Sequence, residues 1–186
     1  MDLKEQLHER VARCVTRHAR ADIKLSSGKL SDFYFDGRRV SLDARGLHFL
    51  AALLWQQLAG RVDAVGGLTL GADPITGGVL AAAAAQGADL KGFICRKAAK
   101  EHGMGRIVEG PELSKGDRVA LLDDVATTGS SFIQALEALE QQYGKGFVNV
   151  VGCYCIVDRQ EGAKEALAQR GLVLYPIFTK SDFPAL

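Results

Sequence analysis

The sequence lacks several features that mark specialised classes of protein. Its 186 residues contain no stretch of about 18 apolar residues, and the longest alanine-rich run covers only residues 79–85. We therefore expect no membrane-spanning helix. The first ten residues are charged and have no apolar core, which argues against a secretory signal peptide and for a cytoplasmic location. No C-x-x-C pair occurs, so a zinc or thioredoxin-like site is not expected. The four cysteines are expected to be small hydrophobic residues.

A net charge of one sign is also missing. The chain has 23 Lys+Arg and 22 Asp+Glu, giving a formal charge of +1, which disfavours nucleic-acid binding. Hydrophobic residues make up 47% and charged residues 24%, which is typical of a globular protein and excludes disorder. The length favours a single domain.

The first forty residues differ in pattern from the rest. Apolar residues recur every four positions from Leu3 to Val15, which predicts an amphipathic helix. The Ser-Ser-Gly sequence at 26–28, followed by three aromatic residues at 33–35, predicts a turn and then a strand. At least two of these aromatic side chains are expected to pack in the core, although stacking near a ligand is open to them.

From about residue 43 onward, helical and strand-like segments alternate. Helices are expected over 43–59, from 73, over 130–143 and over 161–170. Strands are expected over 62–66, 90–95, 118–122, 147–157 and 172–177. This order predicts an α/β protein with a parallel sheet and helices on both faces. Ligands bind at the carboxyl ends of such strands, where the polar segments 66–74, 96–111 and 123–131 are expected. Ser41 or Asp43, and Asp73 before Pro74, are the expected helix caps.

The most informative segment runs from Val119 to Ser131 and reads Val-Ala-Leu-Leu-Asp-Asp-Val-Ala-Thr-Thr-Gly-Ser-Ser. A buried strand ends in two carboxylates, and a loop of hydroxyls and glycine then leads into a helix. The N–H groups at a helix N-terminus bind phosphate, aided by the helix dipole, and Gly129 lets the backbone approach closely. The carboxylates need hydroxyl donors or a metal as partners. Two ribose hydroxyls beside a 5′-phosphate satisfy both needs; the alternative is an ordinary helix start capped by Thr128.

Two common nucleotide motifs are absent, since no G-x-x-x-x-G-K-[ST] and no G-x-G-x-x-G after a strand occurs. A sugar phosphate is therefore expected rather than ATP or NAD. The Asp-Asp segment resembles the phosphoribosyl-diphosphate motif of type I phosphoribosyltransferases. Four further segments, in the same order along the chain, resemble parts of the orotate phosphoribosyltransferases. They are a substrate segment at 25–31, a diphosphate loop at 67–74, a mobile loop at 96–103 and a base-binding segment at 157–162.

The resemblance implies a type I phosphoribosyltransferase fold in a single domain over 1–186, with an N-terminal helix and substrate hood in 1–40 and an α/β core in 41–186. It implies a glycosyltransferase that moves the phosphoribosyl group from 5-phosphoribosyl 1-diphosphate to N1 of orotate. The products are orotidine 5′-monophosphate and diphosphate, a step of pyrimidine (UMP) biosynthesis. It further implies a Mg²⁺ ion held mainly by substrate and water, and a homodimer with shared active sites. No nucleic-acid or membrane partner is expected.

Basic side chains gather in the mobile-loop segment, which contains two glycines. A leaving diphosphate needs its charge neutralised as the C1–O bond breaks, and glycines let a loop open and close. From spacing alone, a solvated charged loop is equally compatible. By resemblance, Lys100 is the catalytic lysine that assists diphosphate departure. The residues assigned to phosphoribosyl diphosphate in this loop are Arg96, Lys97, Lys100 and His102.

The resemblance also assigns roles within the Asp-Asp segment. Asp123 and Asp124 are catalytic residues that hold the ribose hydroxyls. Phosphoribosyl diphosphate is assigned to all of Asp123, Asp124, Val125, Ala126, Thr127, Thr128, Gly129, Ser130 and Ser131. Orotate is assigned to Thr127 and Arg159, because an arginine fork pairs with a planar carboxylate. Orotate carries that carboxylate, whereas uracil and the purines do not.

Two positions depart from the enteric bacterial members of the family. Ser26 replaces a lysine, and residues 73–77 lack a lysine that those members place on the diphosphate. Asp73 is left with two interpretations, a helix cap or a contact to the metal through water. Two rival functions are transfer to another base and non-catalytic sensing of phosphoribosyl diphosphate. Arg159 and the Arg-Lys-x-x-Lys-x-His loop favour orotate over another base. A non-catalytic regulator is disfavoured, because such a protein is expected to carry an added nucleic-acid-binding segment and none is seen in this sequence.

Overall fold

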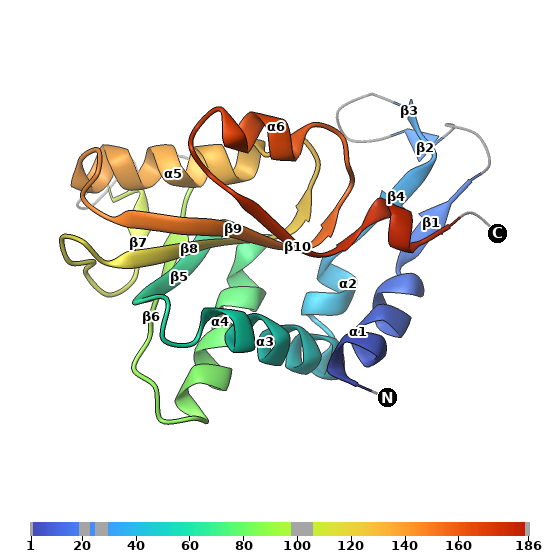
Figure 1. The fold of residues 1–186 in the computed structure, drawn as a ribbon, viewed down its shortest axis with the longest axis horizontal. Coiled ribbons are helices and arrows are strands. Elements are labelled where there is room, and N and C mark those ends of the chain that lie inside the picture. Colours follow the sequence, from blue (N-terminus) through green and yellow to red (C-terminus); the bar gives the residue numbers. More distant parts are fainter. Residues whose placement is uncertain (1, 19–22, 25–29, 98–105, 185–186) are drawn as a thin grey trace.

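A six-stranded sheet forms the centre of the computed structural model, which describes residues 2–18, 23–24, 30–97 and 106–184 (Figure 1). The strand order is β10-β9-β8-β5-β6-β7, and only β7 runs antiparallel to its neighbour. The strands are β5 (Ala64–Leu68), β6 (Lys91–Cys95), β7 (Val108–Glu109), β8 (Arg118–Ala126), β9 (Asn149–Asp158) and β10 (Leu174–Thr179). The predicted α/β architecture with a mostly parallel sheet is confirmed.

Helices cover both faces of this sheet, as Figure 1 shows. Helices α3 (Ala44–Leu58) and α4 (Ala72–Ala84) cover one face, and α5 (Ser130–Tyr143) and α6 (Ala163–Ala168) cover the other. Helix α4 packs against β5, β6 and β8 and against α3, whereas α5 packs against β5, β6, β7 and β8, and α6 packs against β10. No helix in the described part of the chain is long and apolar enough to cross a membrane.

Alternate residues of the central strands pack into two separate hydrophobic cores, one on each face of the sheet. In β8, Ala120 and Leu122 join the core under α3 and α4, whereas Val119 and Leu121 join the core under α5 and α6. Such strands are apolar throughout because both of their faces are buried. Three of the four cysteines are buried on the α5 side, and all four are free. Burial raises the pKa of the Cys95 and Cys153 thiols to about 12, so they act as small hydrophobic residues, as predicted.

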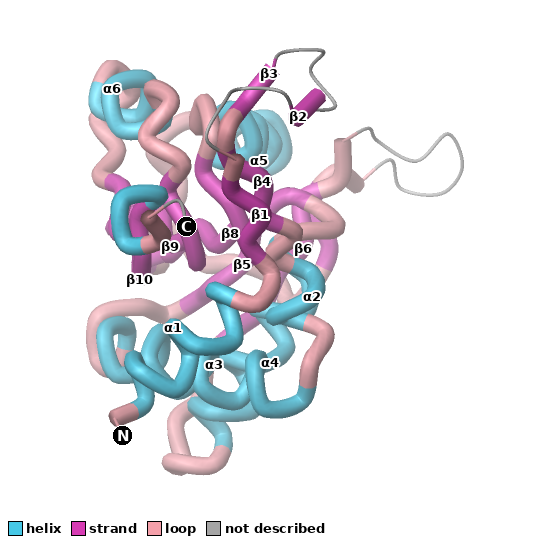
Figure 2. The backbone as a smooth tube through the Cα atoms, turned by 90° about the vertical axis from the view of Figure 1, so that its right-hand side faces the viewer, coloured by secondary structure: helices cyan, strands magenta, loops and turns pink. Residues whose placement is uncertain are grey.

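The N-terminal segment forms a hood at one end of the sheet. Its strands β1 and β4 pair antiparallel, as do β2 and β3 (Figure 2). Phe33 and Phe35 are buried and Tyr34 is 41% exposed, which confirms that two of the three aromatic residues pack in the core. The elements are α1 (Leu3–Ala12), β1 (Val15–Arg17), β2 (Ile23–Lys24), β3 (Leu30–Ser31), β4 (Phe33–Phe35) and α2 (Arg38–Ser41).

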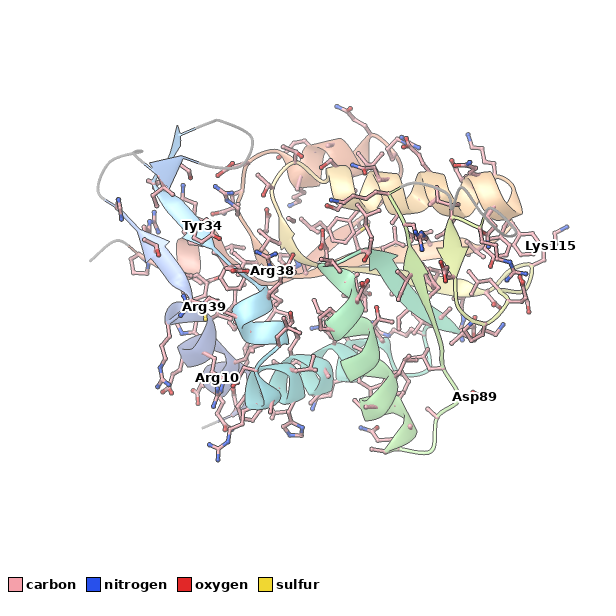
Figure 3. The ribbon with its side chains drawn as sticks, turned by 180° about the vertical axis from the view of Figure 1, so that it is seen from behind. Arg10, Tyr34, Arg38, Arg39, Asp89 and Lys115 are labelled. Atoms are coloured by element: carbon pink, nitrogen blue, oxygen red, sulfur yellow. The ribbon has the colours of Figure 1, made fainter. Side chains whose placement is uncertain are left out.

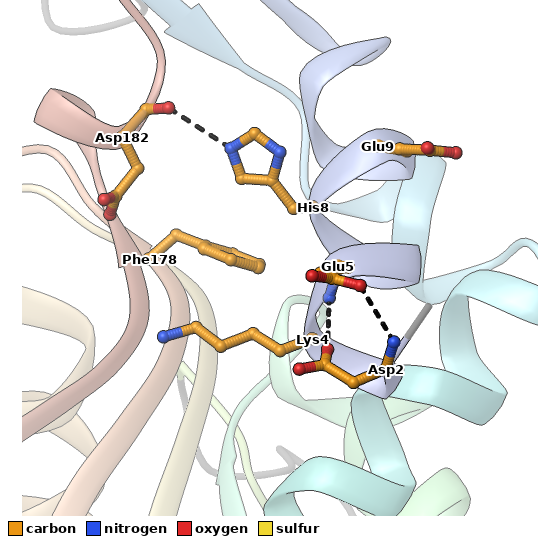
Figure 4. A pocket seen from close by; sticks show the side chains of 7 residues that line it. All are labelled: Asp2, Lys4, Glu5, His8, Glu9, Phe178 and Asp182. Atoms are coloured by element: carbon orange, nitrogen blue, oxygen red, sulfur yellow. Dashed lines mark hydrogen bonds between the residues drawn. The ribbon is translucent and has the colours of Figure 1, made fainter.

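Helix α1 docks against the C-terminal residues around the 3₁₀ turn η1 (Lys180–Asp182) (Figure 4). Asp2 and Glu5 form a capping box, since each carboxylate accepts the other's backbone N–H at 2.8–2.9 Å. His8 lies 3.2 Å from the Asp182 carbonyl oxygen and stacks on Phe183 with ring centroids 4.8 Å apart. A shallow pocket of about 590 Å³ remains between α1 and β10.

Several predicted boundaries need correction. Strand β8 continues through the two aspartates to Ala126, because Asp123, Val125 and Ala126 pair with residues of β9. Asp43, and not Ser41, caps α3 by accepting the Gly46 N–H at 2.7 Å. The expected cap by Asp73 is wrong, because Gly71 is the N-cap of α4. The Asp73 carboxylate instead accepts the Thr69 hydroxyl at 2.7 Å.

Candidate active site

A cleft of about 1410 Å³ opens at the carboxyl ends of β5, β8 and β9, beneath the hood. Its wall comes from the strand β4 and start of α2, the loop after β5, the end of β8, the start of α5 and the residues after β9. The parallel strands therefore place the predicted segments 66–74 and 123–131 around one hollow, whereas Lys97 is the only described residue of the segment 96–111 that lines it.

The acid pair lies at the floor of this cleft. Asp123 is only 6% exposed, and its Oδ1 accepts the Asp124 N–H at 2.9 Å. The backbone of two glycines, Gly37 and Gly71, lies in close contact with the acid pair. A Cβ on Gly37 would lie 2.5 Å from the Asp124 Cβ, and a Cβ on Gly71 would lie 2.8 Å from the Asp124 Oδ1 and nearer still to Asp123. Any larger residue at either glycine would displace the carboxylates.

Burial raises the pKa of both carboxyls above the ordinary value for aspartate. At Asp123 the neighbouring negative charge of Asp124 adds to this effect. At Asp124 the positive charge of Arg38 opposes it. The ligand-free pair therefore resists double ionisation, and a ligand that brings hydroxyl donors or positive charge would favour its ionised form.

The loop after β8 presents hydroxyls and free backbone N–H groups. Gly129 is the N-cap of α5, with φ at 79°, so the left-handed conformation suits glycine. No side chain in the described part of the chain caps this helix, so the predicted alternative, a Thr128 cap, is wrong. Its first N–H groups are left for a ligand. Four hydroxyl residues line the cleft here, namely Thr127, Thr128, Ser130 and Ser131.

Arg159 lies at another wall of the cleft and is only 7% exposed. Its Nη2 donates to Ser31 Oγ at 2.9 Å, to the Phe33 carbonyl oxygen at 3.1 Å and to Glu161 Oε1 at 2.9 Å. Its Nε is buried and has no hydrogen-bond partner among the described residues. A buried donor without a partner is costly, so the acceptor for this Nε comes from outside the described residues, either from the rest of the chain or from a ligand.

The comparisons with known proteins agree with this geometry. A family model for the phosphoribosyl transferase domain matches residues 47–172. The orotate phosphoribosyltransferase of Aquifex aeolicus (strain VF5) is 41% identical over 86% of this chain and 85% of its own. The crystal structure of Mycobacterium tuberculosis H37Rv orotate phosphoribosyltransferase with Fe(III) dicitrate has a TM-score of 0.81. It is 36% identical and covers 99% of this chain and 100% of its own.

The chain belongs to the orotate phosphoribosyltransferase family. A second structure of the Mycobacterium tuberculosis enzyme contains 5-phospho-alpha-D-ribosyl 1-diphosphate. It is 32% identical, with a TM-score of 0.77 and coverage of 98% of this chain and 99% of its own. The type I phosphoribosyltransferase fold that the sequence predicts is thereby confirmed.

Most of the residues that the orotate phosphoribosyltransferase resemblance assigns to the site meet in the cleft. Those that line it are Lys97, Asp123, Asp124, Val125, Thr127, Thr128, Ser130, Ser131 and Arg159. Ala126 is buried behind the wall. Arg96 does not line the cleft and pairs with Glu109 at 3.0 Å. Lys100 and His102 lie outside the described residues. The roles of all these residues stay predictions.

The sequence reasoning gave no role to five cleft residues, namely Asp36, Gly37, Arg38, Ile23 and Glu161, the last of which lies inside the predicted base-binding segment. The first three form a charged, glycine-containing turn directly after the aromatic strand β4. That pattern could have singled them out, because a glycine beside charged residues often marks a close approach. Glu161 follows Arg159 by two positions, and its carboxylate was not considered as a partner of that guanidinium.

Proposed function

We propose that this protein transfers the phosphoribosyl group from 5-phosphoribosyl 1-diphosphate to N1 of orotate, giving orotidine 5′-monophosphate and diphosphate. The observation that carries this proposal is Arg159, a nearly buried arginine that lines the cleft and whose Nε has no partner among the described residues. A planar carboxylate fits an arginine fork, and orotate is the base that carries one. The family relationship supports the same reaction.

The cleft orders the substrate groups by their chemistry. The 5′-phosphate binds the free N–H groups at the start of α5 and the hydroxyls beside them. The ribose hydroxyls donate to Asp123 and Asp124, which fixes C1 toward Arg159 and the bound orotate. N1 of orotate attacks C1 and loses its proton to water, while the C1–O bond breaks, its electron pair leaves with the diphosphate, and C1 inverts. The carboxylates balance the positive charge that develops on the ribose ring in the transition state.

We also propose that Mg²⁺ accompanies the substrate. Asp36, Asp123 and Asp124 present carboxylate oxygens to the cleft, and oxygen is the donor that Mg²⁺ prefers. The described residues contain no cluster of three or more side chains that could hold a metal. The ion would therefore take most of its ligands from substrate and water, and it would neutralise charge on the diphosphate. Asp73 does not cap helix α4. Its second interpretation, a contact to the Mg²⁺ ion through a water molecule, stays a proposal.

We propose a cytoplasmic homodimer in which the basic loop of each subunit serves the other subunit's cleft. Lys97, at the start of that loop, lines the cleft of its own subunit, so the exchange would involve the loop residues that follow it. Lys100 would then reach the partner's diphosphate and assist its departure. This arrangement rests on the resemblance of the loop to the family's mobile loop.

The direct test is an absorbance assay with phosphoribosyl diphosphate, Mg²⁺ and orotate. Orotate absorbance should fall, and omission of the metal with added chelator should stop the reaction. Uracil, adenine and hypoxanthine serve as competing bases in parallel reactions. Consumption of one of these bases, with none of orotate, would contradict the assignment of Arg159 to the orotate carboxylate.

The shared-site arrangement can be tested by mixing two inactive variants. Lys100→Ala removes the loop lysine, and Asp124→Asn disables the cleft. If loops are exchanged, each mixed dimer has one cleft that is intact in both respects. Refolded equimolar mixtures should then recover about a quarter of wild-type activity. If each loop serves its own cleft, the mixture stays inactive. Lys100→Ala alone should lower turnover far more than thermal stability.

A further inference from the structure

The cations that line the described part of the cleft are few. They are Lys97, Arg159 and Arg38, set against the carboxylates of Asp36, Asp123, Asp124 and Glu161. The two N–H groups of Arg159 Nη2 share three acceptors in the cleft wall, which hold this side chain in place. The loop after β5 that ends at Gly71, together with residues 73–77, contains no lysine or arginine. An anionic diphosphate at that loop needs a cation from elsewhere.

The turn between β4 and α2 supplies such a cation, Arg38, beside the loop after β5. Gly37 abuts Asp124 from one side, and Gly71 abuts Asp123 and Asp124 from another. Arg38, which follows Gly37 directly, therefore stands where the loop after β5 meets the acid pair. Figure 3 labels Arg38 at the top of α2, close to Tyr34, which also lines the cleft.

Asp36 holds the side chain of Arg38 in place, and part of the guanidinium stays free to bind a ligand. Its Nε donates to Asp36 Oδ1 at 3.0 Å, and its backbone N–H donates to the same oxygen at 3.3 Å. The side chain is nevertheless 54% exposed, so guanidinium N–H groups remain available to a ligand in the cleft. Asp36 thus orients the guanidinium, which lowers the entropy lost when it binds a ligand.

We propose that Arg38 binds the diphosphate group of phosphoribosyl diphosphate and stabilises its charge as it leaves C1. This inference rests on the proposed function. A guanidinium fork suits phosphate oxygens, and a fixed cation at the leaving group acts most strongly in the transition state. In this chain it would take over the task of the lysine that residues 73–77 lack.

Two other anions in the cleft have better partners. The orotate carboxylate is assigned to Arg159, which lies against Ser31 and Phe33 rather than against Gly37. The 5′-phosphate is assigned to the start of α5, where Gly129 packs against the Ala163 backbone of α6. The Gly37 turn contacts Asp124, and the loop after β8 runs from the acid pair to the start of α5. The Gly37 turn and the start of α5 therefore lie on different sides of the acid pair. The diphosphate is the remaining anion.

Arg39 provides a matched control within the same helix. Arg39 carries the same charge as Arg38 and lies in the same helix, α2, but it does not line the cleft. Its positive charge acts instead on the Cys14 thiol, on the side toward α1. Figure 3 shows Arg39 below Arg38, toward α1. Loss of Arg39 changes the net charge as much as loss of Arg38 does.

The test compares Arg38→Ala, Arg38→Lys and Arg39→Ala in steady-state assays and in calorimetry with inorganic diphosphate. Arg38→Ala should raise KM for phosphoribosyl diphosphate and weaken inhibition by diphosphate about tenfold. Arg38→Lys should recover part of that loss, because the charge remains without the fork. Arg39→Ala should match the wild type. KM for orotate and inhibition by ribose 5-phosphate should stay unchanged in all three, and thermal unfolding confirms that each variant folds.

Two results would overturn the inference. Arg38→Ala could bind diphosphate as the wild type does, or it could lose affinity for orotate or ribose 5-phosphate instead. Calorimetry with diphosphate requires no turnover, so this result is independent of the assay for the proposed function. A wild-type protein that consumes no orotate would overturn the proposed function, while a tenfold loss of diphosphate affinity in Arg38→Ala would still support the role of Arg38.

Discussion

The two ends of strand β8 carry charge in opposite ways. At its first residue, Arg118 pairs with Asp63 through two parallel contacts, Nη2 to Oδ1 at 2.8 Å and Nε to Oδ2 at 3.0 Å. The hydrogen bond from Arg118 lowers the pKa of the Asp63 carboxyl to about 2. At the carboxyl end, Asp123 and Asp124 lie side by side, and burial raises the pKa of both.

This contrast separates charge that serves the fold from charge that serves a ligand. Opposite charges at the sheet's amino edge satisfy each other at the surface. Two buried like charges destabilise the folded state, and the fold alone has no use for them. Their retention indicates a substrate that supplies the missing partners. A variant at the carboxyl end should therefore lower activity and raise stability, whereas one at the amino end should lower stability and leave activity unchanged.

The largest effect is expected from Asp123→Asn at the carboxyl end. Activity should fall about 100-fold or more, because a neutral amide neither holds the ribose hydroxyl as strongly nor balances charge at C1. Stability should rise. The raised folded pKa means that wild-type stability declines as pH increases through that pKa, and the variant lacks this decline. Each pKa unit removed corresponds to about 1.4 kcal/mol.

Urea unfolding at about pH 5 and about pH 8 measures this gain. The stability difference between Asp123→Asn and the wild type should grow toward the higher pH. The Asn Oδ1 can still accept the Asp124 N–H, so the fold keeps its hydrogen bond. A variant that is less stable than the wild type at both pH values would break the contrast between the two ends of β8.

The next effect concerns Arg159, which follows the neighbouring strand β9. Arg159→Lys keeps the charge and loses the fork, so it cannot bond Ser31, Glu161 and a substrate carboxylate together. KM for orotate should rise about 10- to 100-fold, with KM for phosphoribosyl diphosphate unchanged. Kinetics with each substrate varied in turn measure the difference. An equal rise in both KM values would show that Arg159 supports the cleft as a whole.

Gly71→Ala should have a smaller effect on activity, about tenfold, by pushing the carboxylates of the acid pair out of position. Gly77→Ala, in the same helix α4, is the control because a Cβ there meets nothing within 4 Å. It should keep full activity and gain about 0.5–1 kcal/mol of stability. Equal activities for the two alanine variants would show that the cleft tolerates a shift of the acid pair.

The smallest effect is expected at the amino end of β8. Asp63→Asn should lower the free energy of unfolding by about 0.5–1 kcal/mol at neutral pH, since the Asp63 side chain is 39% exposed and solvent screens the pair. The stabilisation exists above the unfolded pKa and disappears as pH falls toward the lowered folded value. Unfolding curves across acidic pH measure this loss. Turnover should be unaffected, and a large loss of turnover would link this edge to the cleft.

Much of the fold could be predicted from the sequence because the signals are local. Helix α5 begins and ends at the predicted residues, Ser130 and Tyr143, because Gly129 and Gly144 bound its apolar pattern. The continuous apolar runs of β8 and β9 predicted buried parallel strands. The acid-hydroxyl-glycine segment is contiguous, so its residues necessarily reach one place.

The remaining features depend on contacts between distant segments. Aspartates are poor strand residues, yet pairing with β9 carries β8 through Asp123 and Asp124. Helix α2 and strand β7 are too short to show a period. Arg38 enters the cleft only because Gly37 packs against Asp124, and no local pattern contains that contact. The sequence therefore predicted the segment that defines the site better than the turn that completes it.

The docking of α1 has a consequence for how the chain is made. His8 contacts the Asp182 carbonyl oxygen and the ring of Phe183, while Lys4 lies over Phe178 at 5.6 Å. Helix α1 thus packs against residues such as Asp182, which lies 174 positions after His8 in the sequence. Domains otherwise tend to assemble from the N-terminus during translation. Here helix α1 gains these contacts only after residues 178–183 have left the ribosome.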